Sequence, residues 1–408
     1  MCRKILFFVT EFPTLSETFI LNQITGALDL GNDVTILALK RGNIEQVHAD
    51  IKTYGLLEKV IYVNLSNHKG KRLMQAISCG VRNPIRTMRL LNYKKYGAIT
   101  KTLQPVIAAH KVPKQAFDLI VAHYGNVGLI ASILQNQGLL TGQLVTFFHG
   151  YDVTRIVEQK GATFYEFLFQ SDSALLPISD FWARRLIELG ANKEKIRVHH
   201  MGIDINRFPM QSLQPTQQTL QLLLVARLTE KKGIPDAIRA VQFLQAHGLD
   251  TVLHLVGDGE NRVQLEELTA SLKLQNQVQF HGFLDQDQVK VQFQTSDLFI
   301  LPSVVAQDGD MEGIPVSLME AMAQGKPVIS TIHSGIPELI THGKTGFLVP
   351  EHDAEALGQA ILDYLQLSEE RKVQMVNQAR EKVCDAFDIE VLNNRLFREE
   401  INKSFETR

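Results

Sequence analysis

The sequence predicts an α/β protein made of two doubly wound, Rossmann-like domains. The chain has 408 residues, more than one ordinary core accommodates, so two domains of about 200 residues each are expected. Short apolar runs alternate with amphipathic stretches, which is the pattern of parallel strands joined by helices. This pattern starts again after the polar, glutamine-rich segment 210–219, so a second sheet is expected there.

The first domain opens with a strand, a helix and a second strand. The apolar run 5–10 and the run 33–39 are the expected strands, with a helix over 16–31 between them. Ser16 is expected to cap the start of that helix, and Gly31 to end it. Further strands are expected at 118–123, 143–150 and 174–179.

The second domain repeats this arrangement, and the two domains are expected to join near 205–219. We assign residues 1–205 to the first domain, 206–385 to the second and 386–408 to a C-terminal helix. The strands expected in the second domain are 220–228, 251–260, 278–284, 298–303 and 327–332.

Composition excludes several classes of protein. The apolar share of 45% and charged share of 21% are ordinary for a globular chain, and a net charge of −2 gives no bias toward nucleic acid. Cys2, Cys79 and Cys384 are far apart, without the spacing of a zinc site or a disulfide framework. The first apolar run is too short for a signal peptide, and no run reaches the roughly 18 residues that span a bilayer. A cytoplasmic protein is expected.

One long segment carries only basic charge. Between Glu58 and Asp118 the chain has twelve Lys or Arg residues and no Asp or Glu. Apolar residues are interleaved with them over 73–93, as in a basic amphipathic surface that binds anionic lipid. The alternative is a solvated helix face whose acidic partners lie elsewhere in the fold.

Two glutamates flank a helix start in GDMEGIPVSLMEAMAQGKPV, residues 309–328. Pro315 suits the first turn of a helix, so Glu312 lies in the preceding loop and Glu320 in the second turn. A helix N-terminus binds anions such as phosphate. Carboxylates on either side of a phosphate would accept hydrogen bonds from hydroxyls, as in a nucleotide diphosphate sugar, although Glu320 alone could also be a surface residue.

Several segments together resemble a known family over nearly the whole chain. EGIPVSLME has the E-x7-E pattern of retaining glycosyltransferases of the GT-B fold, family 4, also called group 1. Within that family the chain is most similar to the enzymes of colanic-acid and amylovoran exopolysaccharide assembly. The resemblance implies two domains that face a cleft, with the C-terminal helix crossing back to the first domain. The matching segments are FPTLSETFILNQI, HGYD, PISDFWARRL, ARLTEKKG, QDGDMEGIP and IHSGIPELI.

The resemblance assigns the donor-binding residues to the second domain. Arg227 and Lys232 would clamp the donor diphosphate, where the alternative for Arg227 is a surface ion pair. Glu320 would hold the ribose hydroxyls and Glu312 the donor sugar. The resemblance also implies a donor contact at the loop residue Gly313. Backbone N–H groups of Ile314 and Val316 would lie beside the phosphates or sugar. Residues His281 to Leu284 would lie beside the base.

The resemblance places the transferred sugar beside the first domain. His149 would contact that sugar, with Asp152 orienting it, although a histidine at a strand end is more often a packed residue. His123, at another strand end, is either an acceptor contact or a structural residue. FPTLSE stands where many members have a Gly-Gly turn, so Ser16, Glu17 and Thr18 either contact donor or acceptor or only cap their helix.

The implied reaction is a metal-independent, retaining transfer of a hexosyl group, without a cofactor. The donor would be a nucleotide sugar, and the acceptor a polyprenyl-diphosphate-linked oligosaccharide reached at the inner face of the plasma membrane. The alternatives on this scaffold are a nucleotide-sugar epimerase, a phosphorylase and a non-catalytic sugar-nucleotide-binding module. A dinucleotide oxidoreductase is disfavoured because VGDGE lacks the third glycine of that fingerprint.

Overall fold

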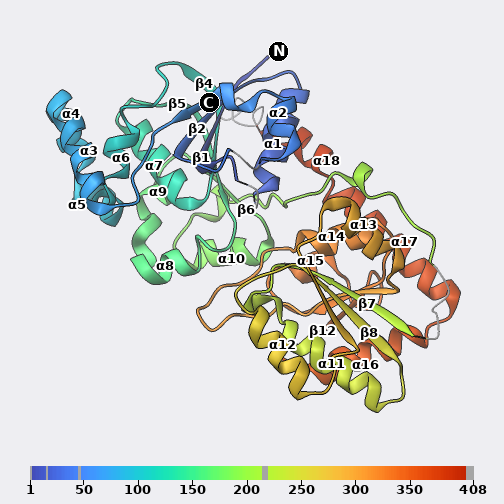
Figure 1. The fold of residues 1–408 in the computed structure, drawn as a ribbon. Coiled ribbons are helices and arrows are strands. Elements are labelled where there is room, and N and C mark those ends of the chain that lie inside the picture. The colour runs from blue at the N-terminus through green and yellow to red at the C-terminus, as the bar shows by residue number, and fades with distance from the viewer. Residues whose placement is uncertain (1, 15–16, 45–46, 214–218, 401–408) are drawn as a thin grey trace. The chain divides into compact units, whose positions relative to one another are not determined.

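The computed structural model describes residues 2–14, 17–44, 47–213 and 219–400. The chain forms two compact units, Met1–His200 with Ile389–Arg408, and Met201–Asp388. Each unit holds one six-stranded sheet, and every strand pair within both sheets is parallel. The predicted α/β class with two parallel sheets is therefore confirmed (Figure 1).

The sheet of the first unit has the strand order β3-β2-β1-β4-β5-β6. The interior of β1 is buried on both faces, which explains why its sequence is continuously apolar rather than alternating. The sequence predicted five of these strands and missed β3, a three-residue edge strand. The strands are β1 (Lys4–Phe12), β2 (Asp33–Arg41), β3 (Val60–Tyr62), β4 (Ala116–His123), β5 (Thr141–Phe148) and β6 (Ala174–Pro177).

Helices connect the strands of the first unit. Helix α1 (Thr18–Asp29) has Glu17 at its N-cap position, whereas the predicted cap Ser16 lies outside the described residues. Gly31 follows the last turn with a positive φ of 77°, which confirms the predicted stop. The other helices are α2 (Ala49–Thr53), α3 (Lys69–Arg82), α4 (Pro84–Leu90), α5 (Tyr93–Tyr96), α6 (Gln104–Ala108), α7 (Gly125–Asn136), α8 (Arg155–Lys160), α9 (Glu166–Gln170) and α10 (Asp180–Glu188).

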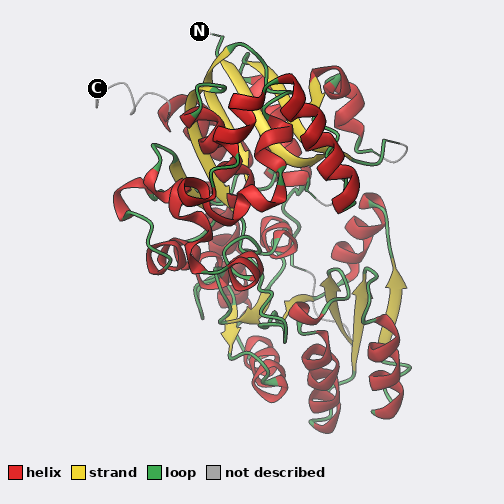
Figure 2. Ribbon diagram, turned by 90° about the vertical axis from the view of Figure 1, so that its left-hand side faces the viewer, coloured by secondary structure: helices red, strands yellow, loops and turns green. Residues whose placement is uncertain are grey.

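The second unit repeats the winding with the strand order β12-β11-β10-β7-β8-β9. Helices surround the strands of both sheets (Figure 2). The strands are β7 (Leu220–Val225), β8 (Thr251–Val256), β9 (Val278–Gly282), β10 (Leu298–Leu301), β11 (Val328–Thr331) and β12 (Phe347–Val349). The helices are α11 (Ile234–Ala246), α12 (Arg262–Ser271), α13 (Gln286–Thr295), α14 (Val316–Ala323), α15 (Ile336–Leu339), α16 (Ala354–Leu365) and α17 (Glu369–Ala386).

The end of the chain returns to the first unit. Helix α18 (Ile389–Asn394) packs on α1, and its Asn393 side chain donates to the backbone oxygen of Asn22 at 3.2 Å. The π-helical turn η7 (Arg395–Glu400) follows, where the oxygen of Phe397 accepts a hydrogen bond from Arg3 at 2.9 Å. The final segment is therefore part of the first unit, although it follows the second in sequence.

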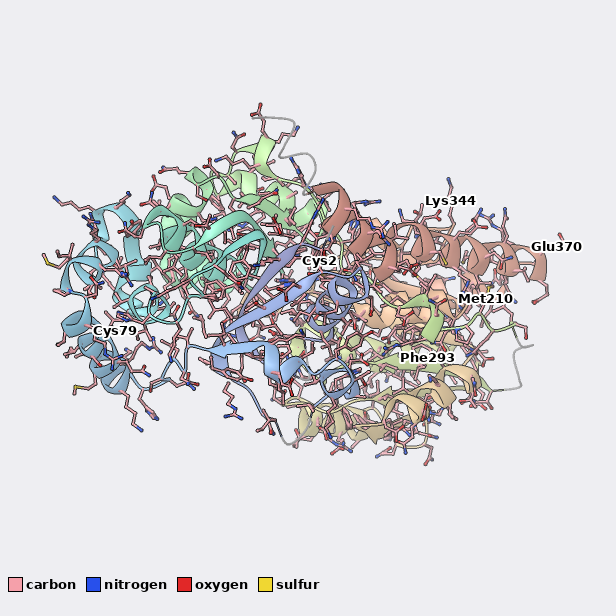
Figure 3. All side chains as sticks on the ribbon, turned by 90° about the horizontal axis from the view of Figure 1, so that it is seen from above. Cys2, Cys79, Met210, Phe293, Lys344 and Glu370 are labelled. Carbon is pink, nitrogen blue, oxygen red and sulfur yellow. The ribbon has the colours of Figure 1, made fainter. Side chains whose placement is uncertain are left out.

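Cys2, Cys79 and the buried Phe293 are labelled in Figure 3, which draws the described side chains as sticks. Phe293 is 1% exposed in the apolar cluster of the second unit. Cys2 and Cys79 lie far apart in the first unit, and all three cysteines are free thiols. Among the described helices, none is both long and apolar enough to cross a membrane.

Candidate functional site

Each sheet reverses its winding direction between two neighbouring strands. The loops that follow these strands carry several of the candidate residues. In the second unit the chain winds outward from β7 through β8 to β9, and from β10 through β11 to β12 in the other direction. Ligands of doubly wound sheets bind beyond the carboxyl ends of the two strands at such a switch. The loops after β7 and β10 carry Arg227, Lys232 and Glu312.

The loop after β7 is held in place by main-chain contacts. Ala226 N–H donates to Val256 and Leu228 N–H donates to Asp258, each at 3.0 Å. Gly257 has a φ of 131°, and a Cβ there would overlap the carbonyl oxygen of Ala226, so only glycine permits this approach. Arg227 is exposed on this loop, and among the described residues no carboxylate pairs with it. Its guanidinium is therefore available to an anion.

Lys232 and Glu312 form an ion pair across the switch point. Lys232 Nζ lies 3.0 Å from Glu312 Oε2, and Lys231 Nζ lies 3.4 Å from Glu312 Oε1 and 3.0 Å from Asp310. Burial alone would raise the pKa of Glu312, but the charges of Lys232 and Lys231 outweigh it and hold the pKa below its ordinary value. The carboxylate is therefore ionised and nearly covered, at 8% exposure.

The backbone of the loop that carries Glu312 is held by a second pair of side chains, His333 and Glu351. Glu312 N–H donates to His333 Nε2 at 3.1 Å, and His333 Nδ1 lies 2.7 Å from Glu351. The other oxygen of Glu351 accepts from Val305 N–H at 2.8 Å, so one carboxylate ties both ends of the loop together. The position of Glu312 thus depends on hydrogen bonds through the side chains of His333 and Glu351, which the sequence did not reveal.

Helix α14 places Glu320 one turn beyond this loop. Pro315 is its N-cap residue, and Val316 is its first residue, so the expected helix start is confirmed. Gly313 and Ile314 lead into it, with Ile314 buried against the core. Burial raises the pKa of Glu320 to about 7. Within the described part of the chain no donor contacts its carboxylate, which leaves both oxygens available to a ligand.

The segment from His281 to Leu284 ends β9 at the same edge of the sheet. His281 Nε2 is 2.9 Å from His254 Nδ1, and His254 Nε2 is 2.8 Å from the side-chain oxygen of Gln221. The His281 ring is thus engaged within the sheet, and Leu284 packs against the core. Phe283 between them is 85% exposed, a large aromatic surface that the sequence analysis did not single out.

His149 of the first unit lies in an aromatic cluster after β5. Its Nε2 is 3.1 Å from His123 Nδ1, and its ring lies 4.7 Å from that of Tyr124 and 4.8 Å from that of Phe19. Burial lowers the pKa of His149 to about 3, and burial beside His149 lowers that of His123 well below its ordinary value. Both rings are neutral at physiological pH, so this group hydrogen-bonds without carrying charge.

Asp152 supports the loop that carries His149. Its Oδ1 accepts the main-chain N–H groups of His149 at 2.9 Å and Gly150 at 3.1 Å, and its Oδ2 accepts that of Gly125 at 2.8 Å. Burial raises its pKa to about 6, against the lowering effect of these donors. The carboxylate therefore orients the backbone of His149, and it joins the ends of β4 and β5.

Glu17 is a further carboxylate at this edge. Tyr124 Oη donates to Glu17 Oε1 at 2.8 Å, and Thr14 Oγ1 donates to Oε2 at 3.0 Å. Burial raises the pKa of Glu17, although both hydrogen bonds oppose that rise. Tyr124 also packs on His149, so Glu17 belongs to the same cluster. Its neighbour Ser16 lies outside the described residues.

Three contacts within the site were not predicted from sequence, although His123 and Glu17 were candidate residues. Lys231 shares Glu312 with Lys232, His123 pairs with His149, and Glu17 bonds Tyr124. Each joins segments distant in sequence, and only the strand order brings them together. The described residues contain no group of three or more His, Cys, Asp or Glu side chains arranged to hold a metal ion.

Comparisons with known proteins identify the family of this chain. Residues 207–382 match the family described as glycosyl transferases group 1. The chain is 40% identical over 399 residues to a putative colanic acid biosynthesis glycosyltransferase, WcaL, of Escherichia coli K12. It is also 40% identical over 401 residues to the amylovoran biosynthesis glycosyltransferase AmsK of Erwinia amylovora. Each alignment covers 96% of this chain and 98% of the relative.

Solved structures share the fold over the full chain. Anabaena Alr3699/HepE, crystallised with UDP and glucose, matches with a TM-score of 0.71 at 19% identity, covering 100% of both chains. A glycosyltransferase from Rickettsia africae also matches with a TM-score of 0.71 at 19% identity, covering 99% of this chain and 100% of that one. The chain therefore belongs to the group 1 glycosyltransferases and has the GT-B fold.

Proposed function

We propose that this protein transfers a hexosyl group from a nucleotide-diphosphate sugar to a lipid-linked oligosaccharide, in the assembly of a colanic-acid-like exopolysaccharide. The observation that carries the donor assignment is the cationic group at the β7–β10 switch point, where Lys232 contacts Glu312 in the loop before α14 and Arg227 is exposed in the loop after β7. The exopolysaccharide assignment is supported by the names of the relatives WcaL and AmsK.

The donor diphosphate would lie between Arg227, Lys232 and the first N–H groups of α14. Arg227 is unpaired among the described residues, while Lys232 would exchange its bond to Glu312 for a phosphate oxygen. Charge that develops on the leaving diphosphate is stabilised by such preorganised cations. Glu312 is then available to hydrogen-bond the donor sugar. The available carboxyl of Glu320 would accept the ribose hydroxyls.

The acceptor reaction would take place beside His149. A neutral imidazole supports a hydrogen-bonding role toward the sugar. A covalent route needs carboxylates on both faces of the anomeric carbon. We propose front-face attack with retention of configuration, in which the departing diphosphate takes the acceptor proton and catalysis rests on positioning and charge stabilisation. Asp152 would act through the backbone of His149, and Glu17 through Tyr124.

Metal independence is part of the proposal because Arg227 and Lys232 would supply the positive charge. Transfer should continue in excess EDTA at an undiminished rate. A strict requirement for Mn²⁺ or Mg²⁺ would contradict this part alone. An epimerase would convert its nucleotide sugar without any acceptor, so measuring product with and without acceptor separates that alternative.

The experiment that tests the donor assignment is thermal melting with UDP, GDP, ADP and TDP. A ligand that binds only the folded state raises the melting temperature. One nucleotide should stabilise the wild type, and Glu320→Gln should lose most of that effect. If none of the four stabilises the protein, the donor site is not where we propose it.

We also propose that the protein associates with an anionic membrane surface through α3 and α4, at the inner face of the plasma membrane. Apolar side chains that project into solvent on these helices include Ile77, Val81, Ile85 and Met88. Cations on the same helices would attract anionic headgroups. Co-sedimentation with phosphatidylglycerol vesicles at low salt tests this, and equal binding to neutral vesicles would contradict it.

A further inference from the structure

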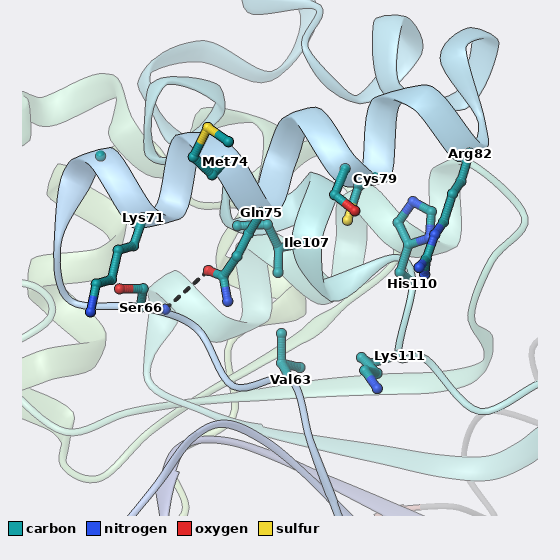
Figure 4. Close-up of a pocket in the computed structure, with 12 residues that line it drawn as sticks. Val63, Ser66, Lys71, Met74, Gln75, Cys79, Arg82, Ile107, His110 and Lys111 are labelled. Atoms are coloured by element: carbon teal, nitrogen blue, oxygen red, sulfur yellow. Dashed lines mark hydrogen bonds between the residues drawn. The ribbon is translucent and has the colours of Figure 1, made fainter.

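A groove of about 700 Å³ runs along α3 on the first unit. Figure 4 shows α3 along one side, with Val63 and Lys111 facing it. From Gly70 to Arg82 the helix rises about 18 Å, so the groove is long rather than round. An elongated groove of this length suits an extended hydrocarbon chain better than a sugar or a nucleotide.

The middle of the groove is apolar. Val63 and Ile107, both at most 4% exposed, and the more exposed Met74 form its surface. Gln75, which also lies in this region, uses its side chain to bond the backbone of Ser66 at 3.2 Å. The remaining apolar surface would be stabilised by contact with the methylene groups of a hydrocarbon chain, because contact removes both from water.

One end of the groove is a cationic cluster. Arg82, His110 and Lys111 lie together at this end in Figure 4. No described carboxylate pairs with Arg82 or Lys111, and no residue that lines the groove is acidic. The Nε2 atom of His110 is buried and has no hydrogen-bond partner among the described residues. A phosphate placed here would neutralise both cations, and it would favour a protonated His110 that donates from Nε2.

The position of this end argues against the reacting acceptor as the occupant. Lys111 precedes β4, whose far end carries His123 and contacts His149. The eight residues of β4 span about 26 Å. Lys111 thus belongs to the segment that enters β4, whereas the proposed transfer site is built from the loops that leave β4 and β5.

We propose that the α3 groove binds one anionic phospholipid of the bilayer, with an acyl chain along Val63, Met74 and Ile107 and the phosphate at Arg82, His110 and Lys111. The proposal rests on the membrane association proposed above. The groove adds a site that holds one lipid molecule in a defined place, whereas α3 and α4 alone would only adsorb to the bilayer surface. Val81, 80% exposed on the same helix, lies where the helix would meet the bilayer.

The test uses a soluble lipid, so that binding does not depend on a bilayer. Dihexanoyl phosphatidylglycerol below its micellar concentration would be titrated calorimetrically against the full-length protein. Dihexanoyl phosphatidylcholine and inorganic phosphate serve as probes that lack the charge or the chain. We expect a one-to-one complex with phosphatidylglycerol, and binding at least tenfold weaker for either control. Equal binding of either control would overturn the proposal.

Matched variants separate the groove from diffuse charge. Arg82→Gln/Lys111→Gln removes two cations from the groove, and Arg89→Gln/Lys94→Gln removes two exposed cations outside it. The first variant should bind the lipid at least tenfold more weakly, and the second within twofold of the wild type. Equal losses would mean nonspecific attraction and would refute the site. Tighter binding of a polyprenyl diphosphate that displaces phosphatidylglycerol would assign the groove to the acceptor instead.

Failure of this proposal is distinguishable from failure of the transferase proposal. Stabilisation by nucleotide reports on the second unit, and the groove variants should leave it unchanged. Retained lipid binding without any transfer would reject only the proposed reaction. Transfer to a water-soluble acceptor without lipid binding would reject only the groove.

Discussion

The two units carry candidate sites of opposite electrostatic character. In the second unit, Lys231 and Lys232 face the ionised Glu312, and Arg227 is exposed nearby in sequence. In the first unit, His123 and His149 are paired and neutral. The same doubly wound sheet therefore supports a charged site in one unit and an uncharged, aromatic one in the other.

This difference matches the two chemical partners of the proposed reaction. A nucleotide diphosphate is anionic and its departure adds charge, so the donor half needs cations that are already in place. The reacting part of the acceptor is a neutral hydroxyl, which needs orientation more than charge. We expect mutations in the second unit to change rates through charge, and mutations in the first through geometry.

The largest effect is expected from Lys232→Met. This change removes a cation from the proposed diphosphate site, and loss of one such group costs about 10²- to 10³-fold in kcat. Steady-state transfer assays would measure it. A loss under tenfold would show that Lys232 serves only to neutralise Glu312, and the charged character of the second unit would then be structural.

The control for this change addresses the fold. Removing one partner of a buried ion pair destabilises a protein strongly, because the other charge stays buried. Lys231 still contacts Glu312 in the variant, which limits that cost. The double variant Lys232→Met/Glu312→Gln removes both charges and should melt close to the wild type, yet stay inactive. Lys231→Met should reduce kcat less than Lys232→Met does.

A smaller effect is expected from Glu320→Gln. A charge-assisted hydrogen bond contributes about 1.5–3 kcal/mol, so the Kd of the nucleotide should rise roughly tenfold or more. Because the pKa of Glu320 is about 7, the wild-type affinity should increase as pH rises from 6 to 8 and the acceptor carboxylate forms. The variant should show no such increase in calorimetric titrations.

Ionisation of Glu320 should lower the stability of the fold as pH rises, whereas it raises the affinity for the nucleotide. Between its ordinary pKa of 4.5 and about 7, Glu320 binds more protons in the folded than in the unfolded state. The free energy of unfolding therefore falls as pH rises through that window. Without nucleotide, Glu320→Gln should melt above the wild type at pH 8 and close to it at pH 4.5. Equal differences at both values would show that Glu320 is not buried in its neutral form.

The fold was predictable because parallel strands buried on both faces have continuous apolar sequences. The strands missed, β3 and β12, are each three residues long at a sheet edge, too short to form a recognisable pattern. The helix after Pro315 followed from local chemistry, since proline fixes the start of a helix. Sequence signals that act over a few neighbouring residues were thus sufficient for most elements.

The candidate site was predictable only in part. Lys232 and Glu312 were selected by motif, but their direct contact joins loops 80 residues apart and depends on the strand order. The neutral state of His149 depends on burial beside His123, and the order of strands in the sheet decides that contact. Residue types indicated the chemistry, whereas partners and protonation states required the three-dimensional structure.

The smallest effect is expected from His123→Phe, which tests the uncharged character of the first unit. Phenylalanine keeps the stacking on Phe147, whose ring centroid lies 5.0 Å away, but loses the bond to His149. One neutral hydrogen bond contributes about 1 kcal/mol, so kcat should fall roughly fivefold while the KM for the donor stays unchanged. The rate should remain independent of imidazole ionisation between pH 5.5 and 8, because burial lowers the pKa of His149 to about 3 and that of His123 well below its ordinary value. Phe147→Leu, which removes the stacking and keeps the hydrogen bond, is the matched control. If Phe147→Leu lowers kcat as much as His123→Phe does, packing rather than hydrogen bonding orients His149. If the wild-type kcat changes with pH in this range through ionisation of His149, charge acts in both halves of the enzyme.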